Sequence, residues 1–142
     1  MDELEIREAR SESVVDALYP IVSELRDLER EEYRELYAAM REEGYHLFGG
    51  FVDDEPIAAA GVRVGTNFYL GRHAYVYDLV VTETERSKGH GSALLSFVNE
   101  WATERECEAV ELESGLWREE AHRFYERNGY EKYCFSFVYE LA

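Results

Sequence analysis

Cysteine, proline and long apolar runs are scarce in this sequence, and each scarcity excludes a structural class. Only two of the 142 residues are cysteine, so no disulfide framework is expected. Only two are proline and no Pro- or Ser-rich tract divides the chain, which predicts a single domain over residues 1–142. No apolar run approaches the roughly 18 residues of a membrane span, and the acidic N-terminus lacks the features of a signal peptide. We therefore expect a soluble, cytoplasmic protein without a membrane partner.

Positive charge is also scarce. The sequence contains 15 Lys and Arg residues and 31 Asp and Glu residues, which gives a net charge of −16. Only two of the basic residues, Lys88 and Lys132, are lysines. Such a charge repels nucleic acid, so no nucleic-acid partner is expected. An acidic, lysine-poor surface is typical of adaptation to high salt, because salt screens the self-repulsion. We interpret the surface as halophilic, with attraction of a cationic substrate as the alternative.

The hydrophobic pattern predicts a mixed α+β fold with a central sheet of about six or seven strands and about four flanking helices. Alternation predicts strands at residues 4–9 and 130–141, the second as one strand or two, and β-rich segments bounded by turns predict strands at residues 45–52, 56–64, 73–81 and 109–113. Helical spacing predicts helices at residues 11–28 (kinked or split by Pro20), 30–43, 91–106 and 117–128. In the second helix the inward side chains are expected to be Tyr33, Leu36, Tyr37 and Met40.

Residues 86–92 form the most informative segment, because they follow a predicted strand and open a predicted helix. A helix N-terminus presents unpaired N–H groups that attract anions, and glycines at 89 and 91 let a phosphate approach the backbone. Arg86 and Lys88 add positive charge. The spacing fits neither a P-loop nor a dinucleotide fingerprint, which expects Gly or Ala where Leu94 stands. We interpret the segment as a pyrophosphate site.

Two motifs resemble the GNAT superfamily of acetyl-CoA-dependent N-acetyltransferases. The segment RSKGHG at 86–91 is similar to the family's Arg/Gln-x-x-Gly-x-Gly/Ala signature, and AHRFYERNGY at 121–130 is similar to its Ala-x-x-Phe/Leu-Tyr-x-x-x-Gly-Phe/Tyr pattern. The match covers residues 73–132. The resemblance implies the GNAT fold, a mixed sheet splayed between its fourth and fifth strands, with acetyl-CoA in the splay.

The resemblance also implies roles for particular residues. The pantetheine arm would bond the main chain of Leu79, Val80 and Val81. The pyrophosphate would lie on the backbone amides of Ser87, Lys88, Gly89, His90, Gly91 and Ser92, and the side chain of Arg86 or Lys88 would reach the CoA phosphates. Tyr125 would act as the general acid that protonates the departing thiolate, although a tyrosine beside Phe124 on a helix face also suits a packing role. The base is left open between Glu113, Asp78 and a chain of water molecules.

The implied reaction moves an acetyl group from acetyl-CoA to a primary amine of a small molecule or a protein N-terminus. A non-catalytic acyl-CoA-binding regulatory domain is the alternative. The acceptor would lie between the first two helices and residues 67–72, with Tyr33, Tyr37, Tyr69 and Tyr75 as candidate liners. The four histidines do not cluster at the spacing of metal ligands, so no metal is expected. The sequence leaves a homodimer open.

Overall fold

A computed structural model describes residues 3–142 of the chain. The chain divides into two compact units, residues 1–111 and residues 112–142. The single domain predicted over residues 1–142 stays a prediction. No helix in the described part of the chain is long and apolar enough to cross a membrane.

A five-stranded sheet in the order β1-β2-β3-β4-β5 organises the first unit. Its strands are β1 (Glu5–Glu8), β2 (Tyr45–Val52), β3 (Glu55–Asn67), β4 (Gly71–Val81) and β5 (Ala109–Leu112). The pairs β1–β2, β2–β3 and β3–β4 are antiparallel. Asp53 and Asp54 join β2 to β3 with positive φ angles of 50° and 64°, a conformation that Asp tolerates in tight hairpin turns. Strands β3 and β4 run longer than predicted, so residues 67–72 form a tight hairpin end.

The helices are α1 (Glu12–Ala17), α2 (Tyr19–Leu25), α3 (Arg30–Glu42), the short 3₁₀ helix η1 (Glu83–Glu85), α4 (His90–Glu104) and, in the second unit, α5 (Glu119–Arg127). The Ser11 hydroxyl caps α1 by accepting a hydrogen bond from the Val14 N–H at 3.3 Å. Pro20 lies in the first turn of α2, where its missing N–H costs no helical hydrogen bond. The predicted first helix is therefore split into two.

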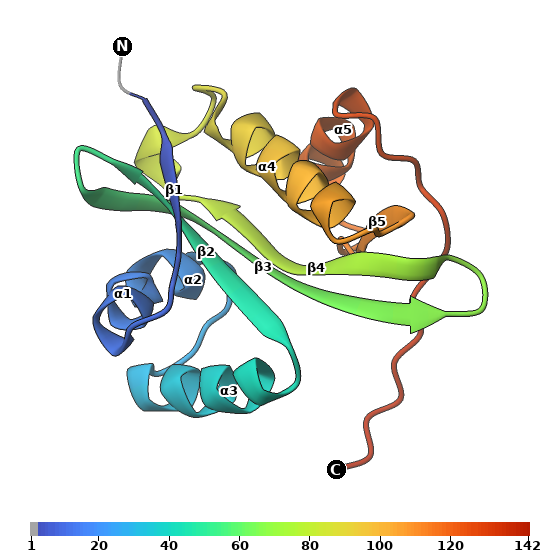
Figure 1. The fold of residues 1–142 in the computed structure, drawn as a ribbon, viewed down its shortest axis with the longest axis horizontal. Coiled ribbons are helices and arrows are strands. Elements are labelled where there is room, and N and C mark those ends of the chain that lie inside the picture. The colour runs from blue at the N-terminus through green and yellow to red at the C-terminus, as the bar shows by residue number, and fades with distance from the viewer. Residues whose placement is uncertain (1–2) are drawn as a thin grey trace. The chain divides into compact units, whose positions relative to one another are not determined.

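The core of the first unit lies on both faces of the sheet. Figure 1 shows α1, α2 and α3 on one face of strands β1–β4 and α4 on the other. Residues 57–62 of β3 are accordingly buried without a break, as expected for a strand covered on both sides. The predicted apolar face of α4 is buried throughout, with Leu94, Leu95, Val98, Trp101 and Ala102 at 4 % exposure or less.

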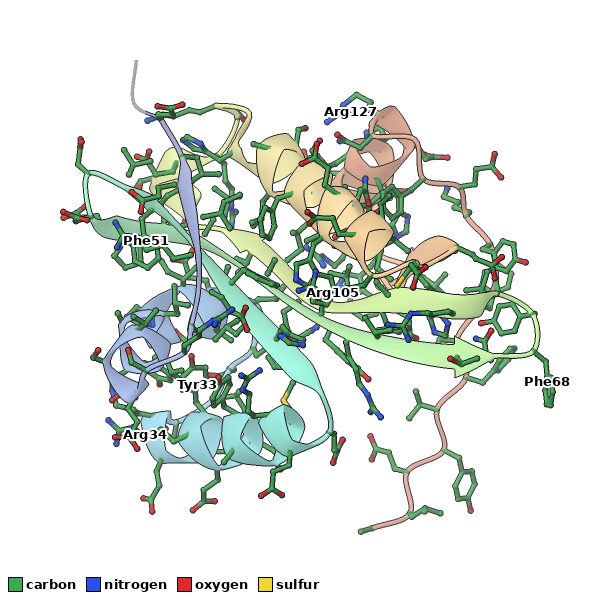
Figure 2. The ribbon with its side chains drawn as sticks, in the orientation of Figure 1. Tyr33, Arg34, Phe51, Phe68, Arg105 and Arg127 are labelled. Carbon is green, nitrogen blue, oxygen red and sulfur yellow. The ribbon has the colours of Figure 1, made fainter. Side chains whose placement is uncertain are left out.

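One predicted core position in α3 is wrong. Tyr33, which is labelled in Figure 2, is 5 % exposed, whereas Leu36 is 45 % exposed. At about 100° per residue, Leu36 lies about 60° from Tyr33 around the helix, while Tyr37 and Met40 lie within about 40°. Leu36 therefore falls on the edge of the buried stripe.

The second unit contains α5, and residues 128–142 form no helix or strand. The strand predicted at residues 130–141 is therefore wrong, and the described sheet has five strands rather than six or seven. Alternation makes a segment suitable for a strand, but the strand forms only where a neighbour pairs with its backbone groups. Instead, Phe137, Tyr139 and Leu141 are each at least 87 % exposed.

Candidate active site

Strand β4 carries a bulge at Tyr77. Gly61 of β3 lies opposite Asp78, and the next residue, Val62, lies opposite Val76, so Tyr77 has no residue opposite it. A guanidinium N–H of Arg26 donates to the Tyr77 carbonyl at 2.8 Å. A bulge bends its strand and redirects side chains, and here it leaves Tyr77 39 % exposed.

Asp78 is buried next to this bulge and both of its oxygens are hydrogen bonded. Oδ1 accepts from Arg26 Nε at 3.1 Å, and Oδ2 accepts from the Tyr45 hydroxyl at 2.7 Å. Burial raises the pKa of Tyr45 well above its ordinary value of 10, and the Asp78 carboxylate raises it further. The Tyr45 phenol is therefore a neutral donor at physiological pH. The sequence indicated that a buried Asp78 needs partners, but no motif pointed to Arg26 or Tyr45.

The loop between η1 and α4 has the backbone conformation expected of an anion site. Ser87 and Gly89 have positive φ angles of 64° and 86°. Gly89 is the N-cap of α4, and within residues 3–142 no side chain caps this helix, so the N–H groups of its first turn are available to a ligand. A side chain at Gly89 would meet no atom within 4 Å. The residues present therefore fit a diphosphate, which would lie against bare backbone.

The charged side chains of this loop are paired within the first unit. Arg86 Nε donates to the Val81 carbonyl at 3.0 Å, and Lys88 lies 3.3 Å from the Glu85 carboxylate. Glu24 of α2 holds the start of η1, just before this loop, because its carboxylate accepts from the Thr82 hydroxyl and from the Glu83 N–H. Sequence analysis missed Glu24, which lies about 60 positions before the loop and belongs to no motif.

The last three residues of β4, Leu79 to Val81, lie beyond the reach of β5. The Glu108 N–H bonds the Arg72 carbonyl at 2.7 Å, which fixes the start of β5 beside the start of β4. Strand β5 has four residues, so it cannot extend along β4 as far as Leu79 in either direction. On that side, the backbone groups of residues 79–81 are positioned to pair with an extended ligand rather than with a strand.

A cavity of about 340 Å³ lies at the other end of β4. Tyr77 at the bulge lines it, together with Arg63, Gly65, Thr66, Asn67, His73, Tyr75 and Glu111. Of the predicted acceptor liners, Tyr75 is among these residues and the Tyr69 hydroxyl donates to Glu111 at 3.0 Å. Tyr33 and Tyr37 do not line the cavity. Their hydroxyls donate to the carbonyls of Val15 and Ala9.

The two remaining candidate residues belong to the second unit. Tyr125 is partly buried in α5, with its ring centroid 5.3 Å from that of Phe124 and 6.1 Å from that of Tyr130. Glu113 is exposed and directly follows β5. The first unit thus brings together Asp78, residues 79–81 and residues 86–92 along β4 and its following loop, and the roles of Tyr125 and Glu113 stay predictions. Among residues 3–142, no group of three His, Cys, Asp or Glu side chains is arranged to hold a metal ion.

Comparison with known proteins identifies relatives that cover most of the chain. The uncharacterized N-acetyltransferase YhdJ of Bacillus subtilis is 40 % identical over 109 residues, covering 75 % of this chain and 77 % of YhdJ. The aminoalkylphosphonate N-acetyltransferase of Salmonella typhimurium is 30 % identical over 144 residues, covering 96 % and 91 % of the two chains.

Solved structures show the same fold. An aminoglycoside N-acetyltransferase solved in complex with CoA has a TM-score of 0.86 at 13 % identity, covering 99 % of this chain and 95 % of that one. Residues 11–130 match the acetyltransferase (GNAT) family. These findings confirm both the resemblance and the fold that the sequence predicted. The chain belongs to the GNAT family of acetyltransferases.

Proposed function

We propose that this protein transfers the acetyl group of acetyl-CoA to a primary amine of a small molecule. One observation carries the proposal: a single strand, β4, links a backbone suited to CoA with a polar cavity suited to an amine. Residues 79–81 and the following loop lie at one end of this strand, and the cavity lies at the other, with Tyr77 at the bulge between them.

The CoA side follows from the backbone. The edge of residues 79–81 that β5 does not reach suits a pantetheine arm, whose amides hydrogen bond as an added strand would. The first-turn N–H groups of α4 suit the pyrophosphate. Arg86 and Lys88 lie beside this position, and exchanging their present partners for phosphate oxygens would strengthen binding.

In the proposed reaction the neutral amine attacks the thioester carbonyl. The N–C bond forms, the C–S bond breaks, the nitrogen loses a proton to a base and the CoA thiolate takes one from the Tyr125 hydroxyl. The two hydrogen bonds that Asp78 accepts support a positioning role for it at the bulge. Because both oxygens of Asp78 already accept hydrogen bonds, Glu113 or a water chain is favoured as the base, and Asp78 is the third candidate.

Two observations favour a small acceptor over a protein N-terminus. The cavity volume of about 340 Å³ lies near the lower end of the ~300–1,000 Å³ range of small-molecule sites. The Salmonella relative, which spans nearly the whole chain, is named for a small amine substrate, an aminoalkylphosphonate.

The test combines donor choice with a matched pair of glycine variants. Gly89 and Gly129 have φ angles of 86° and 90°, and a side chain at either would meet nothing within 4 Å. Alanine therefore introduces the same backbone strain at both positions, but only at Gly89 does it obstruct the proposed phosphate site.

We expect Gly89→Ala to weaken use of acetyl-CoA by about tenfold, the value of one lost hydrogen bond to a charged group. Its use of acetyl-pantetheine, which lacks the pyrophosphate, should be unchanged, and Gly129→Ala should resemble the wild type with both donors. Release of the free thiol with a panel of primary amines measures each rate. Tight CoA binding by calorimetry without transfer to any amine would instead support a non-catalytic acyl-CoA-binding domain.

A further inference from the structure

The cavity beside β4 is built on one face of the β3–β4 hairpin. Arg63 lies opposite Tyr75, and Gly65 lies opposite His73, so the side chains of each pair share a face. The cavity has room there because Gly65 has no side chain, and a methyl group at that position would lie 3.9 Å from the His73 ring. Figure 2 shows Phe68 at the tip of the hairpin with its ring directed away from the sheet.

The cavity is lined by one full positive and one full negative charge on different strands. Arg63 comes from β3 and Glu111 from β5, with β4 between them. Neighbouring strands lie about 4.8 Å apart, so the backbones that carry these two groups are roughly 10 Å apart. That separation suits a small molecule that carries opposite charges at its two ends.

Among the described residues, Arg63 makes one ion pair, and it is a long one. The nearest carboxylate oxygen, from Glu43, lies 3.8 Å from Nη1, and the Arg63 side chain is 42 % exposed. Most of its donors are therefore available, and a guanidinium binds carboxylate and phosphate groups with two parallel hydrogen bonds.

On the β5 side of the cavity, the Glu111 carboxylate suits an ammonium. Glu111 accepts one hydrogen bond from Tyr69 at 3.0 Å, which leaves further lone pairs on its carboxylate. His73 Nδ1 bonds the Gly71 carbonyl at 3.0 Å. Because a carbonyl only accepts, Nδ1 is the donor in this hydrogen bond.

We propose that this cavity selects amines that carry an anionic group, a carboxylate, a phosphonate or a phosphate. Arg63 binds the anion and Glu111 binds the ammonium before it loses its proton. The proposal rests on the proposed acetyl transfer and adds its substrate class. The net charge of −16 alone would favour a substrate with several positive charges. The cavity instead disfavours diamines, because Arg63 repels a second ammonium.

The experiment compares four acceptors of similar length: 2-aminoethylphosphonate, β-alanine, propylamine and 1,3-diaminopropane. We expect kcat/KM for the two anionic amines to exceed that for propylamine by about 10- to 100-fold, the value of a charged hydrogen-bonded pair. The diamine should be the poorest acceptor. Equal use of propylamine, or preference for the diamine, overturns the proposal.

Variants assign the selectivity to Arg63. Arg63→Met should lower kcat/KM for the anionic amines to the level of propylamine, through KM, and leave propylamine unchanged. Arg63→Lys should restore part of the difference, because it keeps the charge but not the paired hydrogen bonds. Arg10→Met makes the same change of charge at a 78 % exposed side chain that pairs with Glu8, and it should have no effect. A uniform loss for all amines in Arg63→Met refutes the assignment.

Calorimetric titration of 2-aminoethylphosphonate into the CoA-saturated protein separates this proposal from the proposed function. Binding that needs Arg63, without transfer to any amine, would refute acetyl transfer and support the subsite. Acetylation of neutral and anionic amines at equal rates would support transfer and refute the subsite.

Discussion

Gly61→Ala is expected to displace Tyr45 from Asp78 and destabilise the first unit. Tyr45 crosses Gly61 to reach Asp78, which lies opposite Gly61 in the β3–β4 ladder. A methyl group at Gly61 would overlap the Tyr45 hydroxyl and ring. Tyr45 is 4 % exposed and packs among Tyr33, α1, α2 and the sheet, so its ring has little room to move aside.

The expected cost follows from these contacts. Losing the hydrogen bond from Tyr45 to the Asp78 carboxylate costs about 1.5–3 kcal/mol, and forcing a methyl group into a packed core costs about 1–3 kcal/mol. Replacing glycine by alanine also stabilises the fold by about 0.4–1 kcal/mol, because alanine lowers the conformational entropy of the unfolded chain. The free energy of unfolding should therefore fall by about 2–5 kcal/mol, measured by urea unfolding in high salt.

Two controls isolate this clash. Gly65→Ala lies on the same face of the same strand, but its methyl group would meet only the His73 ring at 3.9 Å, so its effect should stay within about 1 kcal/mol. In a Tyr45→Leu background the hydroxyl and ring are gone, and Gly61→Ala should then cost less than about 1.5 kcal/mol. An equal cost for Gly61→Ala in both backgrounds, or for Gly61→Ala and Gly65→Ala, would refute the reasoning.

Three further predictions concern Tyr45, Tyr125 and salt. Because the pKa of Tyr45 is raised above 10 in the folded state, its contribution to stability is complete below pH 10 and is lost as pH rises beyond that value. The free energy of unfolding should fall more steeply above pH 10 in the wild type than in Tyr45→Phe, by about 1.4 kcal/mol per pH unit, and equal slopes would contradict this. Tyr125→Phe should lower turnover by about tenfold or more with CoA affinity unchanged in calorimetry, and unchanged turnover would exclude the general-acid role. If the charge of −16 reflects salt adaptation, Tm should rise with KCl concentration, because screening relieves the self-repulsion. A Tm that falls with added KCl would argue against it.

Local patterns in the sequence predicted most of the fold. The bounds of the strand predicted at residues 45–52 matched β2 without error, and the spacing of apolar residues in α4 identified its buried face. These features are readable because they depend on each segment's own periodicity. The strand predicted at residues 130–141 was wrong because a strand also needs a partner, and alternation specifies only which side chains share a face.

The candidate site was predictable only in part, for the same reason. The glycine and basic residues of the 86–92 loop are contiguous, so a motif could identify them. The partners of Asp78 lie 52 and 33 positions away, at Arg26 and Tyr45. Arg63 and Glu111 are brought to one cavity only by the order of the strands. Contacts between distant segments leave no local pattern in a single sequence.

The bulge at Tyr77 explains how the buried carboxylate and the cavity come to share one face of the sheet. Before the bulge, His73 and Tyr75 lie opposite Gly65 and Arg63, on the face that Tyr45 shares through its own pairing with Arg63. In an unbroken strand, Asp78 would point to the opposite face, because side chains alternate. The extra residue shifts the phase by one, so Asp78 lies opposite Gly61 and faces Tyr45. One inserted residue thus places the Asp78 carboxylate on the face that carries Arg63 and Tyr75, in the stretch of β4 between Tyr77, which lines the cavity, and residues 79–81.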